Sequence, residues 1–116
     1  DLKPKLSYLF ADSSLVNRTL VDDLLKYKRL DGVDAFIKKL SSSLFPNGKQ
    51  SMVISKDLET LEKKILVIHG EKDAIIDVSH AKSFKNGNIE IISNAGHNVQ
   101  LEQASKVNEL ILNHIS

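Results

Sequence analysis

A run of branched aliphatic residues at positions 65–68 (ILVI) constrains the fold more than any other feature of this chain. The run is too short for an ordinary helix and is followed directly by His69 and Gly70, so it predicts a strand buried on both faces. Such strands belong to parallel sheets that helices cover. A second strand is predicted at 89–92, after a short helix at 79–84 and a turn, which gives a strand, helix, strand unit with a right-handed crossover.

Helical patterns surround this unit. Apolar residues at helical spacing predict helices over 15–30 and 33–44, the first capped by a short oxygen-bearing side chain at 12–14 and the second packed through its apolar face. A short helix is expected within 52–64, and a C-terminal helix from about residue 104 onward. The expected organisation is a single α/β domain, with a helical cap segment over 1–50 and a strand-helix-strand-helix part over 51–116.

Composition excludes several functional classes. The chain has 116 residues, of which 41% are hydrophobic and 27% charged, as in one soluble globular domain. Sixteen basic and fifteen acidic residues give a net charge of +1, so neither a nucleic-acid nor a membrane partner is expected. Cysteine is absent, which removes disulfides, thiolate catalysis and cysteine zinc sites, and a cytoplasmic location is expected. The longest apolar runs fall far short of the ~20 residues of a membrane span.

Two loops follow the predicted strands, at 70–77 and 94–98. Because open α/β sheets bind ligands beyond the carboxyl ends of their strands, these loops are expected to lie together. A carboxylate of the first loop, Asp73, could then accept a hydrogen bond from His97 of the second, as in the orienting half of a nucleophile-histidine-carboxylate triad. The alternative is that Asp73 caps a turn and His97 closes a glycine loop, since both residue types are common in loops.

These loops also carry a resemblance. Residues 65–73 (ILVIHGEKD) resemble the penultimate strand and acid loop of the α/β-hydrolase superfamily, and residues 95–102 (AGHNVQLE) resemble its catalytic histidine loop. The order, acid and then histidine 24 positions later, agrees with the superfamily. Residues 24–33 (LLKYKRLDGV) and the Val99-Gln100 pair resemble the C-terminal hydrolase-like domain of the dihydrolipoamide acetyltransferase component of acetoin dehydrogenase complexes.

The resemblance implies the C-terminal part of an α/β-hydrolase fold: a helical cap, the last two parallel strands and the final helix. It implies Asp73 as the triad acid and His97 as the triad base. Asp77 stands where many relatives have proline and remains an alternative acid. The resemblance also implies that the chain is part of a longer polypeptide, here called the parent. This parent is then an acyltransferase or serine hydrolase within a multienzyme dehydrogenase complex. A lipoyl group and coenzyme A are implied for the parent, with no cofactor bound by this chain.

A nucleophile is missing from the sequence. None of the five glycines brackets a serine as Gly-x-Ser-x-Gly, and a complete hydrolase of this type needs roughly 200 to 250 residues. The chain, which begins at Asp1 without methionine, is therefore expected to be a second half that is inactive alone and partnered by an N-terminal half. Its unpaired strand edge predicts self-association as a homodimer. Two alternatives are a non-catalytic assembly fragment and part of an unrelated, esterase-like serine hydrolase.

The remaining histidines give no second site. His69 ends the first strand and is expected to be packed and hydrogen-bonded rather than catalytic. His80 and His114 fall in predicted helices without ligand-spaced partners, and the HExxH signature is absent. No metal is predicted.

Overall fold

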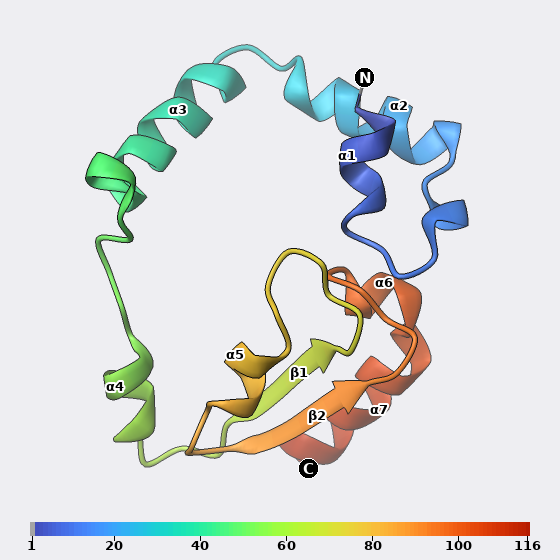
Figure 1. Cartoon of the computed structure of the whole chain (residues 1–116). Coiled ribbons are helices and arrows are strands. Elements are labelled where there is room, and N and C mark those ends of the chain that lie inside the picture. The colour runs from blue at the N-terminus through green and yellow to red at the C-terminus, as the bar shows by residue number, and fades with distance from the viewer. Residues whose placement is uncertain (1) are drawn as a thin grey trace.

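The computed structural model describes residues 2–116. The first half is helical, and the second half contains two strands and three helices (Figure 1). The elements, in chain order, are α1 (Lys3–Ser7), the 3-10 helix η1 (Ser13–Leu15), α2 (Arg18–Lys28), α3 (Val33–Leu44), the 3-10 helix η2 (Pro46–Gly48), α4 (Ser55–Glu59), β1 (Leu66–Gly70), α5 (Ser79–Lys82), β2 (Asn88–Ile92), α6 (Val99–Glu102) and α7 (Ala104–Ile115).

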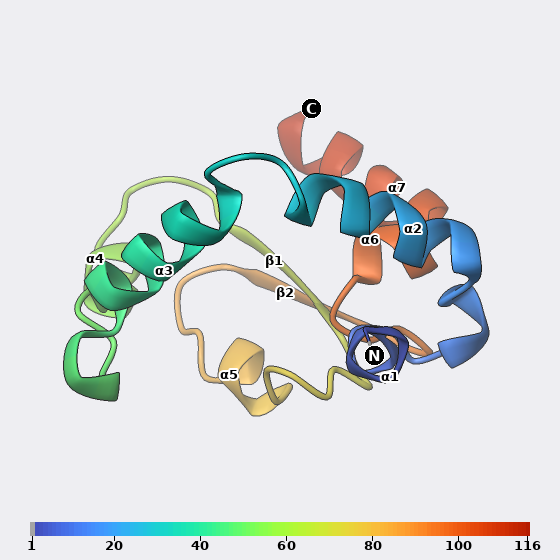
Figure 2. The same ribbon diagram turned by 90° about the horizontal axis from the view of Figure 1, so that it is seen from above.

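The two strands form a parallel pair, as the sequence predicts. Their register runs from Leu66 opposite Asn88 to Gly70 opposite Ile92. Helices α5 and α7 lie on opposite sides of the pair (Figure 2). The prediction of a strand buried on both faces is wrong in degree, because residues 66–69 are only half-buried. Within the described residues, two strands with one short and one longer helix against them expose too much edge to exclude water.

Burial is concentrated in two small clusters. One joins β2 to the C-terminal helices and contains Ile92, Ala95, Val99 and Val107. The other lies in the helical half and contains Leu6, Phe10 and Val16. The second cluster sits beside the loop that follows β2, so the first turns of the chain pack near the carboxyl ends of the strands (Figure 1).

The predicted helix over 15–30 begins later than expected. Asp12 accepts a hydrogen bond from the amide of Ser14 (2.9 Å) and caps only the short helix η1. Asn17 then caps α2, its side-chain oxygen accepting from the Leu20 amide at 2.9 Å. Two capping side chains in succession give the backbone two helix starts, and Val16, with φ −81° and ψ 72°, separates them.

Helix α3 has the predicted bounds but lacks the predicted packing. None of its residues is buried, and the exposed fractions of Phe36 and Ile37 are 63% and 51%. Helices α2, α3 and α4 form an open arc that stands away from the strands (Figures 1 and 2). The apolar face of α3 is therefore uncovered by the described residues. None of the helices between residues 2 and 116 has the length and apolar character of a bilayer-spanning segment.

Candidate active site

The loops that follow β1 and β2 run side by side. The amide of Glu71 donates to the Ile92 carbonyl (2.9 Å), and the amide of Lys72 donates to the Ala95 carbonyl (2.9 Å). The parallel pairing thus continues past the ends of both strands. It places the loop with Asp73 against the loop with His97, as the rule for carboxyl ends of parallel strands predicts.

Glycine makes this close approach sterically feasible. A Cβ added to Gly70 would lie 2.1 Å from the Gly96 carbonyl oxygen and 2.5 Å from the Ala95 carbonyl oxygen, both backbone atoms with little freedom to move. A side chain at position 70 would therefore push the two loops apart. Asn94 also helps to turn the second loop, with a left-handed φ of 56° that asparagine tolerates better than most residues.

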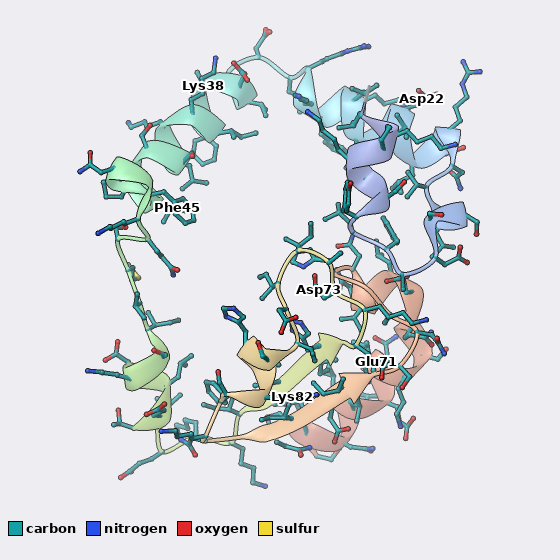
Figure 3. All side chains as sticks on the ribbon, viewed as in Figure 1. Asp22, Lys38, Phe45, Glu71, Asp73 and Lys82 are labelled. Atoms are coloured by element: carbon teal, nitrogen blue, oxygen red, sulfur yellow. The ribbon has the colours of Figure 1, made fainter. Side chains whose placement is uncertain are left out.

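Asp73 is the best-satisfied side chain of the site. One carboxylate oxygen, Oδ1, accepts hydrogen bonds from the amides of Ile75 (2.8 Å) and Ile76 (3.0 Å). The other, Oδ2, lies 2.9 Å from Nδ1 of His97 and 3.4 Å from Nε2 of His69. The Asp73 side chain is only 4% exposed. Figure 3 labels Asp73 on the loop beyond the end of β1.

These contacts keep the Asp73 carboxyl ionised. Burial by itself raises its pKa, but the hydrogen bonds from Ile76, His97 and Ile75 stabilise the charged form and outweigh this effect. The net result is a pKa below the ordinary value for aspartate. Asp73 is therefore a permanent hydrogen-bond acceptor for His97 at neutral pH.

His97 is oriented by this bond and remains accessible. With Nδ1 facing a carboxylate, the neutral imidazole carries its proton on Nδ1, and Nε2 is the basic nitrogen. The His97 side chain is 34% exposed. A group approaching Nε2 could therefore transfer a proton to it, while Asp73 stabilises the resulting imidazolium.

His69 is packed and hydrogen-bonded, as expected. Its side chain is 15% exposed, and its Nε2 lies 3.0 Å from the Ile76 carbonyl oxygen, to which it donates. The same nitrogen lies 3.4 Å from Oδ2 of Asp73. His69 therefore packs beside the carboxylate with its Nε2 proton directed to the Ile76 carbonyl.

The other candidate residues lie away from this pair. Asp77 is exposed, and its Oδ1 accepts from the Ser79 amide at the start of α5 (2.8 Å), which lowers its pKa. His97 is hydrogen-bonded to Asp73 and not to Asp77, so the structure gives the alternative acid no contact with the base. His80 lies in α5 and His114 in α7. Across residues 2–116, no group of three or more side chains that could bind a metal ion comes together.

Glu102 is the residue of this region that sequence reasoning missed. Its carboxylate accepts hydrogen bonds from the amides of Ala11 (2.7 Å), Asp12 (3.1 Å) and Gly96 (2.5 Å). Two of these donors are about ninety positions away along the chain, and no local motif links an acid at the end of a short helix to such distant partners. The one sequence signal that could have drawn attention to Glu102 is its position six residues after Gly96, at the end of the segment that resembles a histidine loop.

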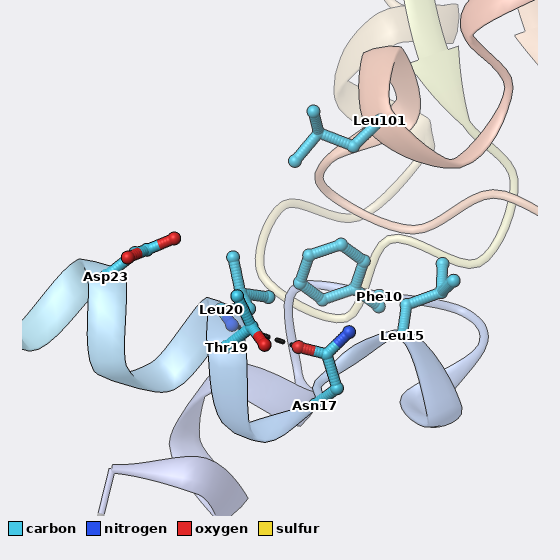
Figure 4. Close-up of a pocket in the computed structure, with 7 residues that line it drawn as sticks. All are labelled: Phe10, Leu15, Asn17, Thr19, Leu20, Asp23 and Leu101. Carbon is cyan, nitrogen blue, oxygen red and sulfur yellow. Dashed lines mark hydrogen bonds between the residues drawn. The ribbon is translucent and has the colours of Figure 1, made fainter.

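Two hollows of the described residues are lined by side chains outside this pair. One, of about 340 Å³, lies between α2 and α6 and is lined by Phe10, Leu20 and Leu101 among others (Figure 4). The second, of about 430 Å³, has an apolar lining from α1, α2 and α3. Neither is lined by Asp73 or His97. Of the pair, His97 is the accessible member, at 34% side-chain exposure, while the Asp73 side chain is 4% exposed.

Comparison with solved structures identifies the architecture. The meta-cleavage product hydrolase from Pseudomonas fluorescens IP01 superimposes with a TM-score of 0.78 at 22% sequence identity, over 98% of this chain and 44% of that one. The chain has the fold of the C-terminal part of an α/β-hydrolase. In this partial α/β-hydrolase fold, helices and two parallel strands account for less than half of the complete enzyme.

Two curated proteins are similar in sequence over nearly the whole chain. The dihydrolipoyllysine-residue acetyltransferase component of the acetoin cleaving system from Cupriavidus necator is 40% identical over 116 residues, which cover 99% of this chain and 31% of that protein. The component of the same name from Pseudomonas putida is 39% identical and is covered to 30%. The partial α/β-hydrolase fold thus spans about a third of these relatives. No family model matches the chain.

Proposed function

We propose that this chain supplies the acid and the base of a Ser-His-Asp triad to a longer polypeptide with an α/β-hydrolase fold. The observation that carries the proposal is the 2.9 Å contact between Asp73 Oδ2 and His97 Nδ1 across the two strand-end loops. Asp73 holds the tautomer of His97, and Nε2 of His97 removes a proton from a serine hydroxyl as the serine attacks an acyl carbonyl.

The nucleophile comes from outside these 116 residues. The sequence has no Gly-x-Ser-x-Gly turn, which in enzymes of this fold presents the serine and contributes an amide to the oxyanion hole. Without a positioned nucleophile and oxyanion hole, an acid and a base supply only a fraction of the mechanism. The chain alone is then inactive, and its partner is the N-terminal part of the same hydrolase fold.

For the reaction we favour acyl transfer, because two acetyltransferase components are about 40% identical to this chain. An acetyl group would pass from a lipoyl thiol to the serine and then to the thiol of coenzyme A. His97 would take the serine proton and give it to the departing lipoyl thiolate, and would then take the proton of the incoming thiol and return it to the departing serine oxygen. The acetylated lipoyl group and coenzyme A are substrates in this scheme, and none of the described residues is assigned to either. Membership in a multienzyme complex is part of the same proposal, and a cytoplasmic location stays an expectation.

Ester hydrolysis is the second candidate. The α/β-hydrolase fold is compatible with it, since the same residues would then activate water in the second step. The two reactions share the acyl-serine intermediate and differ in the acyl donor, a thioester or an ester, and in the acyl acceptor. An assembly role without chemistry is the remaining alternative and requires no reactive serine.

A serine-directed fluorophosphonate probe on the full-length polypeptide tests the proposal. We expect labelling in the wild type, and labelling at least about 10²-fold slower in His97→Ala, because the hydroxyl loses its base. Turnover of acetyl-dihydrolipoamide with coenzyme A, compared with turnover of a short ester in water, then separates transfer from hydrolysis. Absence of labelling in the folded wild type would leave the assembly role.

We also propose that the chain associates with a partner through its uncovered surfaces. The second edge of β1 has no strand partner within residues 2–116, and the apolar face of α3 is exposed. In the longer polypeptide we expect the N-terminal part to cover both. The 116-residue chain by itself should form a homodimer, and sedimentation velocity at several micromolar concentrations measures this. A concentration-independent monomer would contradict the dimer.

A further inference from the structure

The loop that carries His97 is tied to the start of the chain on both sides of the histidine. On one side, the amide of Asn98 donates to the Leu9 carbonyl at 2.9 Å. On the other side, the amide of Gly96 donates to Glu102 at 2.5 Å. The backbone of His97 is therefore held through both of its neighbours.

Glu102 connects the second anchor to the same segment of chain. Its Oε2 accepts from Gly96, while its Oε1 accepts from the amides of Ala11 (2.7 Å) and Asp12 (3.1 Å). Three donors converge on one half-buried carboxylate. Hydrogen bonds to a charged acceptor are roughly twice as strong as neutral ones.

The packing around this carboxylate leaves little room for adjustment. A Cβ added to Gly96 would lie 2.6 Å from the Ala11 nitrogen and 2.8 Å from the Phe10 carbonyl carbon. Residues 9–12 thus lie directly against the backbone of the histidine loop. The loop in turn contacts Gly70, at the end of β1, just before the segment that carries Asp73.

We propose that Glu102 is a positioning residue for His97. It acts through the amide of Gly96 and through residues 9–12, and it fixes the loop in the place where the imidazole reaches Asp73. The effect on turnover rests on the proposed triad, but the effect on the geometry of the Asp73–His97 pair does not.

Glu102→Gln is the sharpest test, because it keeps the size of the side chain and replaces one acceptor oxygen with an NH₂ donor. Whichever oxygen is replaced, the new NH₂ group would face a backbone N–H, and that hydrogen bond would be lost. Glu109→Gln is the matched control, since Glu109 is an exposed carboxylate of α7 whose Oε2 lies 3.2 Å from Nζ of Lys106, on the same helix. Asp73→Asn provides the reference for complete loss of the pair.

The first readout is the Nδ1 proton resonance of His97 in the full-length polypeptide labelled with [¹⁵N]histidine, measured without substrate. We expect a far-downfield proton in the wild type and in Glu109→Gln, and its loss or marked upfield shift in Glu102→Gln and Asp73→Asn. The second readout is kinetic: kcat of Glu102→Gln should fall about 10²-fold with KM nearly unchanged, as for a displacement of about 1 Å at a catalytic group.

Several outcomes would overturn the proposal. A folded Glu102→Gln variant with the wild-type His97 resonance would show that the tie serves stability alone. Rapid hydrogen exchange at the amides of Gly96, Ala11 and Asp12 in the wild type would show that the anchor does not persist in solution.

If Glu102→Gln does not fold, the milder Glu102→Asp variant is judged by the same resonance. A wild type with the downfield proton but without turnover would count against the triad function and leave the positioning role standing.

Discussion

Helices α3 and α7 have the same length, 12 residues, and both carry an apolar stripe, yet they are buried very differently. Helix α7 packs against β1 and buries Val107 to 6% exposure. Helix α3 buries none of its side chains, and Phe36 is 63% exposed. An amphipathic pattern is thus sufficient to specify a helix, but the surface that receives its apolar face has to come from elsewhere.

The same contrast separates the two halves of the chain. Within residues 66–116 the strand-end loops are fixed by backbone pairing, by the glycine contacts and by the carboxylate of Asp73. Within residues 2–64, residues 9–12 meet the histidine loop and Glu102, and residues 58–61 accept hydrogen bonds from Asn86 in the turn before β2. The chemistry therefore depends on the packed half and on one short segment of the helical half.

The largest difference between the halves should appear in turnover. In the full-length polypeptide, Asp73→Asn should lower kcat by about 10⁴-fold, because the amide favours the wrong tautomer of the histidine. Asp34→Asn in α3, an exposed aspartate that pairs with Lys38 (2.7 Å), is the matched change in the helical half and should leave kcat almost unchanged. Steady-state kinetics measures both. Equal effects would remove the functional distinction between the halves.

Alanine substitutions of glycine should lower the unfolding free energy more in the packed half than in the helical half. Gly70→Ala introduces a Cβ against backbone oxygens and should cost about 3 kcal/mol of unfolding free energy. Gly48→Ala meets no atom within 4 Å and is strained only by its φ of +73°, so about 1 kcal/mol is expected. Urea denaturation of both variants gives the two values. A Gly70→Ala variant as stable as Gly48→Ala would mean that the loops can separate freely.

Core truncations should show which helix is packed. Val107→Ala should lower the unfolding free energy by about 2 kcal/mol, whereas Ile37→Ala, 51% exposed, should cost less than about 0.5 kcal/mol in the 116-residue chain. Thermal unfolding or urea titration measures the pair. In the full-length polypeptide the cost at Ile37 should rise, because the N-terminal part is expected to cover α3. An unchanged cost there would contradict this covering.

The smallest effect concerns pH. The folded pKa of Asp73 lies below the unfolded value of about 3.9, so the ionised carboxylate contributes stability above that pH, and the contribution is lost as the pH falls through the folded pKa. Unfolding free energies of the wild type and Asp73→Asn should therefore differ by a constant amount above about pH 5 and converge in more acidic solution. Asp12→Asn, at an exposed carboxylate of the helical half, should show a weaker pH dependence. A difference independent of pH at position 73 would contradict the assigned ionisation.

Much of the local structure could be predicted from the residues themselves. The run at 65–68 predicted a strand, the stripe at 33–44 predicted a helix with the observed bounds, and the position of two loops after neighbouring parallel strands predicted that the loops meet. The start of α2 could not be fixed in this way, because Asp12 and Asn17 are equally good caps and both are used. Helix α6 was missed, because its four residues lie in the segment that was interpreted as the histidine loop.

Residue type and short-range order determined the elements, the parallel pairing and the candidate acid and base, because strand and helix periods and turn chemistry are properties of neighbouring residues. The sequence favoured Asp73 and kept Asp77 as an alternative acid; tertiary structure decided that the carboxylate which meets His97 is that of Asp73, while Asp77 accepts from the Ser79 amide. It also decided the role of Glu102, whose partners Ala11 and Asp12 lie at the other end of the chain. A hydrogen bond depends on distance in space, and for segments this far apart in sequence that distance is set only when the loops pack together.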